Sequence, residues 1–366
     1  MTPATEESAT EESATNLFTL SREALEQYAK DAGQPAFRGR QLFQWMYGKG
    51  ARTFEEMTNL PKAFRHHLEE HATIKHLTLD LMQIAKDRTM KCLFKLPSGL
   101  QVESVLIPDF NENNEAKRLT VCVSSQVGCA MRCSFCATGL MGFKQNLNAA
   151  EIYDQVWQLN ELALEHFGRP VTNIVYMGMG EPMQNYDSVL QSTRLLTDDE
   201  GLGLSPKRIT VSTVGLARRI RQLADDETRF NLAVSLHAPT DEKRSSIMPV
   251  NRNERTDVKA LMDALTYYTK KTGRRITFEY CMFDGFNDTP EDAQHLAALS
   301  ARFPSKVNLI MYNPVSAVPF SKTSEARLNA FIKVLTQKKV LVTVRRSRGQ
   351  DIDAACGQLL VNQQAN

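Results

Sequence analysis

The spacing of apolar and polar positions divides the chain into a helical first part and a longer part in which strands alternate with helices. Short apolar, β-branched runs recur at 118–124, 171–177, 208–213, 231–237, 275–282 and 306–311. Helical stretches separate these runs, and the clearest is 149–167, with Asn148 as its expected N-cap and Glu151 three residues on. Alternation of this kind favours parallel strands joined by crossover helices. The pattern predicts an α/β fold with an open, partial (β/α)6 barrel over 118–345.

Three further segments are predicted before the barrel. Residues 1–15 contain a polar pentapeptide that occurs twice in succession, and we expect them to form a disordered tail. Residues 16–85 are expected to form a small helical domain whose first long helix follows Ser21. Residues 86–117 are predicted to be a β-hairpin extension that turns near Gly99 and ends in a polar loop.

Composition adds limits to this picture. The chain has 366 residues, 42% of them hydrophobic, which is enough for one large core and a smaller appendage. Seven cysteines in a chain of this length do not make a disulfide scaffold, and three of them lie within eight residues, which indicates a metal site. We see no signal peptide and no apolar run of the roughly eighteen residues that a membrane span needs. A cytoplasmic protein without membrane contact is the expectation.

Charge neither requires nor excludes a nucleic-acid partner. The formal net charge is +2, so RNA would have to be bound by local basic patches. Candidate patches are the stretch 37–47 of the helical domain, which also carries aromatic residues, the run 345–348 and the pair 207–208. Each patch has two interpretations that the sequence leaves open, a phosphate-contacting surface or an ordinary solvated face.

The clustered cysteines follow the first strand of the barrel. Cys129, Cys133 and Cys136 have the spacing C-x-x-x-C-x-x-C, which lets one loop supply three thiolates to a four-iron cluster and leaves one iron open. A structural zinc site is the alternative, and it would need a fourth ligand such as Cys122 or His166. The loop resembles that of the radical S-adenosylmethionine (SAM) superfamily, in which the open iron binds SAM.

Polar residues at the ends of later strands form the second candidate site. Residues 177–182 read Met-Gly-Met-Gly-Glu-Pro, a turn in which glycines allow close approach of a ligand and Glu181 offers a carboxylate. Side chains at strand ends meet at one mouth of such a barrel, so they would together bind SAM. Helix caps, and a core role for the histidine, are the other interpretations. The set is Gly180, Glu181, Ser212, Ser235, Leu236, His237 and Asn313.

Two cysteines outside the cluster loop have different surroundings from the rest. Cys92 and Cys281 lie among apolar neighbours, and we expect them to pack in the core. Cys356 lies in a polar, glycine-flanked segment near the end of the chain, within 346–366. A thiol there could reach the barrel mouth and act as a nucleophile. Cys122 precedes the cluster loop by seven residues.

Four motifs together resemble the RlmN/Cfr family of RNA adenine methyltransferases, over roughly residues 20–360. They are the cluster loop with its preceding CVSSQVG, the GMGEP turn, SLHAP at 235–239 and DIDAACGQL at 351–359. The resemblance implies a radical SAM barrel and the methylation of carbon 2 of an adenine in 23S rRNA, and of an adenine in tRNA. The implied cofactors are a 4Fe-4S cluster and two molecules of SAM per turnover, one as methyl donor and one as radical source. A monomer that receives electrons from flavodoxin or ferredoxin is expected.

The resemblance also implies roles for three residues. Cys356 accepts the methyl group, Glu103 takes the ring proton, and Cys122 forms a transient disulfide with Cys356. From the residues alone, Glu103 shares one face of a strand with Val105 and Ile107, but which face is buried stays open. The 346–366 segment then carries the methyl-accepting cysteine, and 16–85 contacts RNA.

Three other functions compete with this one. A Cfr-type enzyme would methylate carbon 8 of the same adenine with the same cysteines. A different radical SAM enzyme, such as an activase of a glycyl-radical enzyme, would not need Cys356. A non-enzymatic iron–sulfur or zinc protein that binds RNA would cleave no SAM.

Overall fold

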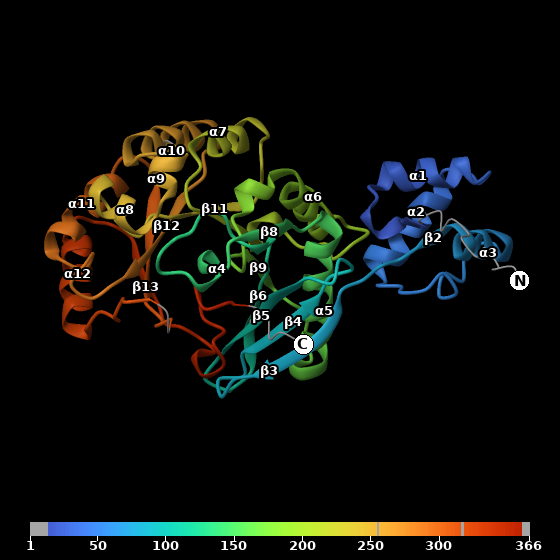
Figure 1. Ribbon diagram of the computed structural model, residues 1–366, viewed down its shortest axis with the longest axis horizontal. Coiled ribbons are helices and arrows are strands. Elements are labelled where there is room, and N and C mark those ends of the chain that lie inside the picture. Colours follow the sequence, from blue (N-terminus) through green and yellow to red (C-terminus); the bar gives the residue numbers. More distant parts are fainter. Residues whose placement is uncertain (1–13, 255, 316–317, 361–366) are drawn as a thin grey trace, which may run out of the picture. The chain divides into compact units, whose positions relative to one another are not determined.

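The computed structural model describes residues 14–254, 256–315 and 318–360, which fall into two compact units (Figure 1). The smaller unit comprises residues up to His76 together with Asp198–Gly203, and the larger unit comprises the rest. The predicted disordered tail lies almost entirely outside the described residues. Ala14 and Thr15 are the exceptions, and Thr15 belongs to a short strand. None of the described helices has the length and apolar character that crossing a membrane requires.

The smaller unit is mainly helical, as its sequence predicts. Helix α1 begins after Ser21, whose hydroxyl accepts a hydrogen bond from the backbone N–H of Ala24. Segment 198–203 joins this unit because Asp198 and Glu200 both form ion pairs with Arg22. Its elements are β1 (Thr15–Asn16), η1 (Leu17–Thr19), α1 (Arg22–Asp31), α2 (Phe37–Phe43), a π-helical turn (Gln44–Gly48), α3 (Lys62–His71) and β2 (Ala72–Thr73).

A ten-stranded sheet forms the centre of the larger unit, in the order β14-β13-β12-β11-β10-β9-β6-β5-β4-β3. Strands from β6 to β14 are parallel, and β3 to β6 are antiparallel to their neighbours. The strands are β3 (Thr78–Ile84), β4 (Met90–Lys95), β5 (Gln101–Phe110), β6 (Ala116–Cys122), β9 (Asn173–Tyr176), β10 (Ile209–Thr213), β11 (Asn231–Ser235), β12 (Ile276–Met282), β13 (Ser305–Met311) and β14 (Val342–Arg345).

Helices and short elements connect the strands of this sheet. The helix predicted over 149–167 is α5, and Asn148 and Glu151 form the expected capping box. The helices are α4 (Ala137–Leu140), α5 (Ala149–Phe167), α6 (Tyr186–Thr197), α7 (Ala217–Asp225), α8 (Asp241–Ile247), α9 (Val250–Asn253), α10 (Val258–Thr272), α11 (Pro290–Ser300) and α12 (Glu325–Gln337). The short elements are β7 (Gln126–Gly128), β8 (Phe143–Asn146), η3 (Pro182–Asn185), η4 (Pro206–Arg208) and η5 (Gln350–Ile352).

The partial barrel and its six predicted strands are confirmed, and the structure adds two strands that the pattern does not reveal. Residues 78–84, placed by sequence in the helical domain, form β3 at one edge of the sheet, so that domain ends near His76 rather than at residue 85. Residues 342–345 form β14 at the other edge. Both edge strands are largely exposed and are held by backbone pairing, so no alternation of buried and exposed side chains predicts them from the sequence.

Alternate residues of the parallel strands face an interior space. Thr120, Val175, Thr210 and Asn308 come from four different strands and line one cavity. Residues between them on the same strands, such as Ile174 and Val307, are fully buried on the opposite face. The apolar core therefore lies on one face of the sheet, while the other face is free to hold a site.

Candidate active site

The cluster loop lies between the end of β6 and the start of α4. Cys129 and Cys133 are buried, and Cys136 is half-buried. Gly128 has a φ of 72°, and a Cβ there would lie 1.8 Å from the carbonyl oxygen of Gly142, so the loop requires glycine. The backbone N–H of Cys129 donates to that carbonyl at 3.0 Å. These contacts hold the loop against the strand pair β7–β8.

The three thiols of the loop affect one another electrostatically. Burial raises the pKa of Cys129 to about 12 and raises that of Cys133 further, and the neighbouring loop thiols add to both effects. Burial likewise raises the pKa of Cys136. Burial disfavours the thiolate form of these side chains, whereas bound iron would convert them to thiolates. The donor set fits a four-iron cluster with one open iron.

A zinc site does not fit this arrangement. Among the described residues, no three His, Cys, Asp or Glu side chains gather closely enough to hold a single metal ion. In an iron–sulfur cubane each thiolate binds a different iron, so the thiols stand further apart than around zinc. The proposed fourth zinc ligands do not help, because His166 is exposed in the last turn of α5 and Cys122 lines a separate cavity.

The Gly-Met-Gly-Glu-Pro turn packs directly on the cluster loop. A Cβ on Gly178 would lie 2.6 Å from the Val123 carbonyl oxygen, and one on Gly180 would lie 2.5 Å from the Cβ of Gln126. Glu181 is buried, and its two carboxylate oxygens accept the backbone N–H groups of Met183 and Val214 at 3.0 and 2.8 Å. Burial raises the pKa of Glu181 to about 7. The carboxylate therefore fixes the turn in addition to facing the cavity beside it.

A cavity of about 150 Å³ lies between this turn and the ends of β10 to β13. The structure brings seven of the sequence-predicted residues to it: Cys136, Gly180, Glu181, Ser212, Ser235, His237 and Cys356. Sequence reasoning missed several other side chains that line it, among them Phe135, Cys281 and Tyr312. Aromatic and apolar lining with a few polar groups is typical of a cofactor pocket.

His237 serves both the core and this cavity. Its Nδ1 accepts the backbone N–H of Cys281 at 2.9 Å, and its ring meets the Phe135 ring edge-on with centroids 4.9 Å apart. Burial lowers the pKa of His237 to about 3, so the imidazole is neutral. Because Nδ1 accepts, the proton lies on Nε2, which is free to donate toward a ligand.

Leu236 and Asn313 do not line the cavity, although both were predicted to bind the cofactor. Leu236 is fully buried and its backbone N–H donates to the carbonyl oxygen of Glu279 at 3.0 Å. Asn313 is buried, its Oδ1 accepts from Gln350, and its Nδ2 has no partner among the described residues. A buried amide donor without a partner is a group that a ligand or water would satisfy.

A buried arginine near the cluster loop was missed by sequence reasoning. The side chain of Arg244 on α8 is fully buried and donates to Asn251 at 2.6 Å and to the carbonyl oxygens of Thr256 and Val214. Burial lowers the pKa of Arg244 to about 10, and its positive charge acts on Cys133. Its sequence context, Asp-Glu-Lys-Arg, is typical of an exposed helix face and contains no signal for this position.

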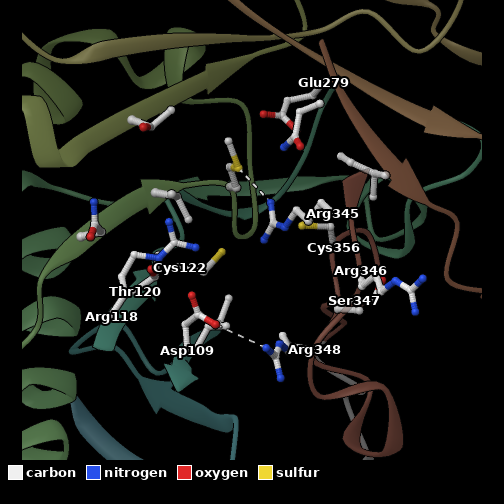
Figure 2. A pocket seen from close by; sticks show the side chains of 18 of the residues that line it. Asp109, Arg118, Thr120, Cys122, Glu279, Arg345, Arg346, Ser347, Arg348 and Cys356 are labelled. Atoms are coloured by element: carbon white, nitrogen blue, oxygen red, sulfur yellow. Dashed lines mark hydrogen bonds and ion pairs between the residues drawn. The ribbon is translucent and has the colours of Figure 1, made fainter. Parts of the chain in front are cut away.

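A second cavity of about 940 Å³ extends along the interior face of the sheet. Cys122 on β6 and Cys356 in the C-terminal segment both line it, and Cys356 lines the smaller cavity as well. Figure 2 shows Cys356 beside Arg345, with Cys122 pointing into the same space. Cys356 thus stands where the two cavities meet, and neither it nor Cys122 is in a disulfide.

Hydrogen bonds to the cluster region hold the C-terminal segment in the barrel. The backbone N–H of Ala137 donates to the Gly357 carbonyl oxygen at 2.8 Å, and the Thr138 hydroxyl donates to the Leu359 carbonyl oxygen at 2.7 Å. Asp87 accepts the backbone N–H of Gly349 at 3.0 Å at the other end of the segment. A cysteine more than two hundred residues from the cluster loop in sequence is thereby placed beside it.

The charges around the two cysteines are coupled. Burial and the neighbouring Cys356 sulfur raise the pKa of Cys122 to about 12, while the charge of Arg345 acts to lower it. The Cys356 sulfur also raises the pKa of Arg345. The guanidinium of Arg345 therefore lies within electrostatic range of both sulfurs.

Glu103 is in a buried position that settles its orientation. On β5 it shares a face with Val105 and Ile107, and Val105 pairs with Cys122 while Ile107 lines the larger cavity. Its side chain is 8% exposed, lies 3.1 Å from the Lys91 ammonium and accepts the Leu360 backbone N–H at 2.9 Å. Burial raises its pKa. Glu103 therefore faces the interior, under the end of the C-terminal segment.

Comparisons with known proteins match the two units separately and the chain as a whole. Residues 15–74 match the family described as ribosomal RNA large subunit methyltransferase N-terminal domain, and residues 123–297 match the radical SAM superfamily. A probable dual-specificity RNA methyltransferase RlmN of Salinibacter ruber is 59% identical over 350 residues, covering 96% of this chain and 95% of that protein.

Two further relatives agree with that likeness. The dual-specificity RNA methyltransferase RlmN of Nitratidesulfovibrio vulgaris is 46% identical over 96% of this chain and 95% of its own length. The crystal structure of a radical SAM methyltransferase from Sphaerobacter thermophilus has a TM-score of 0.87 and 44% identity, covering 94% of this chain and 99% of that one.

Proposed function

Because the chain belongs to the RlmN family of radical SAM dual-specificity RNA methyltransferases, we propose that it methylates carbon 2 of an adenine in 23S rRNA and in tRNA through a methyl group carried by Cys356. The observation that carries the proposal is that Cys356 lines both cavities. A group on its sulfur can be loaded from one cavity and delivered into the other. Adenine carbon 2 is not a nucleophile, so direct transfer from SAM would fail there.

The smaller cavity is where this proposal places SAM. Cys129, Cys133 and Cys136 would hold the 4Fe-4S cluster, and SAM bound to it supplies a 5′-deoxyadenosyl radical, while another SAM supplies the methyl group. Ser212 and Ser235, whose hydroxyl oxygens are 3.5 Å apart, face that space with the Nε2–H of His237. Flavodoxin or ferredoxin would deliver the electrons, and we expect a cytoplasmic monomer.

Cys122 and Cys356 of the larger cavity, together with Glu103 beside the end of the C-terminal segment, would complete the reaction. Cys356 loses its thiol proton and gains an S–CH3 group, one hydrogen atom is removed from that methyl, and its carbon bonds to ring carbon 2. The adduct would give one electron back to the iron–sulfur cluster, and Glu103 takes the ring proton. The Cys122 thiolate then attacks the sulfur of Cys356, so that a disulfide forms and the bond from sulfur to the transferred carbon breaks with its electron pair on that carbon. The carbon takes up one proton to become a methyl group, and the methylated RNA leaves.

We expect Cys122→Ala to trap RNA on the protein. Without the second thiol the bond from Cys356 to the methylene carbon is not cleaved, so a covalent RNA–protein species should accumulate while methylated product falls about a hundredfold or more. Denaturing gels with radiolabelled RNA measure the adduct, and mass spectrometry of wild-type product separates carbon 2 from carbon 8. If this variant released free methylated RNA at the wild-type rate, the proposed disulfide step would be contradicted.

Basic residues at the strand starts are where we propose the RNA backbone to bind. Arg118, Arg208 and Lys306 lie at or just before the first residues of their strands and line the larger cavity, and within the described residues none is in an ion pair. The cluster and SAM occupy the opposite ends of the strands. An adenosine turned out of its stack would therefore enter from the basic end.

Removing two of these cations should weaken RNA binding without affecting SAM chemistry. For Arg118→Ala combined with Arg208→Ala we expect affinity for an RNA hairpin to fall about tenfold or more, with a salt dependence reduced by about two charges. Fluorescence anisotropy at several salt concentrations measures both. Lys333→Ala removes an exposed cation of α12 that lines neither cavity and should leave binding unchanged. Equal RNA affinities for the double variant and the wild type would mean that the RNA backbone binds at another surface.

A further inference from the structure

A buried ion pair links β4 to Glu103. Lys91 lies opposite Val105 in the antiparallel pair β4–β5, and Glu103 lies opposite Leu93, so the two charged side chains are diagonal neighbours on one face. The Lys91 Nζ is 3.1 Å from the Glu103 Oε1, and their side chains are 11% and 8% exposed. A lysine side chain is seldom buried unless it is paired with a group of opposite charge.

The other contacts of Glu103 leave its two oxygens with different partners. Its Oε1 faces the Lys91 ammonium, whereas its Oε2 accepts the neutral backbone N–H of Leu360 at 2.9 Å. Its own carbonyl oxygen accepts the Ser124 hydroxyl at 2.6 Å, so the backbone at this position is fixed as well. Because Oε1 faces a full positive charge whereas Oε2 faces only a neutral N–H group, Oε2 is the oxygen that exchanges its partner more readily.

The charges that act on Glu103 come from two elements. Burial raises the pKa of Glu103, Lys91 on β4 lowers it, and Asp353 in the C-terminal segment raises it. Lys91 is thus the cation that offsets both burial and Asp353. Without Lys91 the pKa of this carboxyl group would rise further, so that a smaller fraction of it would be ionised and able to accept a proton.

We propose that Lys91 is a positioning residue for ring deprotonation, which keeps Glu103 ionised by pairing with Oε1 and leaves Oε2 to take the proton. The inference rests on the proposed function, in which Glu103 is the proton acceptor. In that step the ring C–H bond breaks, its electron pair stays in the ring, and an O–H bond forms on Glu103. Lys91 does not accept the proton itself, because its ammonium already carries its full complement.

The hydrogen bond from Leu360 to Glu103 also connects this proposed base to the segment that carries Cys356. Leu360 follows Cys356 by four residues in the same segment, whose Leu359 carbonyl is bound by Thr138. Glu103 and Cys356 are therefore held by one stretch of chain. An adenine attached to the sulfur of Cys356 would lie against the surface that Glu103 faces.

A pH profile separates this role from a merely structural ion pair. In the full-length enzyme with its cluster reconstituted, release of RNA from the covalent adduct should be about tenfold or more slower at neutral pH for Lys91→Met than for the wild type. Since loss of Lys91 raises the pKa of Glu103 further, less of the carboxylate is ionised at neutral pH, and the rate should recover as the pH rises. Lys91→Arg keeps the charge and should remain near the wild type. Single-turnover reactions resolved on denaturing gels, from about pH 6 to about pH 9, give these rates.

Control variants show which part of the proposal a negative result contradicts. Glu103→Gln should trap the adduct at every pH, and 5′-deoxyadenosine formation and a thermal melt establish that each variant is folded and binds SAM. If Lys91→Met does not fold, Lys91→Gln replaces it in the same assay. The proposed base fails if Glu103→Gln releases RNA as the wild type does. The inference alone fails if Glu103→Gln traps the adduct but Lys91→Met releases it normally, or slowly with no recovery at high pH.

Discussion

Cys356→Ala should abolish RNA methylation, with a loss of about a thousandfold or more, while SAM is still cleaved. The reason is that Cys356 lines both cavities and is the residue proposed to carry the methyl group between them. Transfer of labelled methyl from SAM to RNA measures the first effect. Formation of 5′-deoxyadenosine by the anaerobically reconstituted protein measures the second.

The matched control for this variant is another buried cysteine. Cys92→Ala removes a fully buried thiol on β4 that lines neither cavity, so methylation should continue even if some stability is lost. Full methylation by Cys356→Ala would contradict methyl transfer through Cys356. It would favour the other radical SAM activities, which do not use this cysteine.

Cys133→Ser should remove the cluster and with it every radical step. Cys133 is buried between the other two loop thiols, and serine offers a much weaker ligand to iron than thiolate does. Iron and sulfide analysis with an absorption spectrum of protein purified without oxygen should show wild-type iron and little in the variant. We expect 5′-deoxyadenosine formation to fall about a thousandfold or more.

Two outcomes of that experiment would contradict the assignment. Zinc in place of iron in the wild-type protein would favour a structural metal site, although the described side chains do not form one. Iron retained at the wild-type level by Cys133→Ser would mean that other residues hold the cluster. Cys92→Ala should keep both the iron and the spectrum.

Much of the fold could be predicted because it rests on local patterns. Six parallel strands, the helix α5 and its capping box follow from apolar spacing and from Asn148 and Glu151. The edge strands β3 and β14 could not be predicted, since their side chains are mostly exposed and their stability comes from backbone pairing. The end of the helical domain was placed nine residues too late for the same reason.

The candidate site was predictable where ligand chemistry demands close sequence spacing. The residues of the cluster loop lie within a few positions of one another, and so do those of the glycine turn. The sequence alone therefore indicates their chemistry. Lys91 and Arg244 were missed because nothing in their sequence neighbourhoods distinguishes a buried functional position from an ordinary one. Burial of Lys91 and Arg244 is decided by partners that arrive from other elements.

The sequence by itself determined the radical SAM barrel and the family of the reaction, and it predicted the three cluster cysteines, because periodicity and short motifs are properties of neighbouring residues. The tertiary structure decided how these parts form one site. It placed Cys356 between the two cavities, turned Glu103 to the interior and set Lys91 beside it. The place of Cys356 depends on segments more than two hundred residues apart being held together by hydrogen bonds from Ala137 and Thr138, which no local pattern encodes.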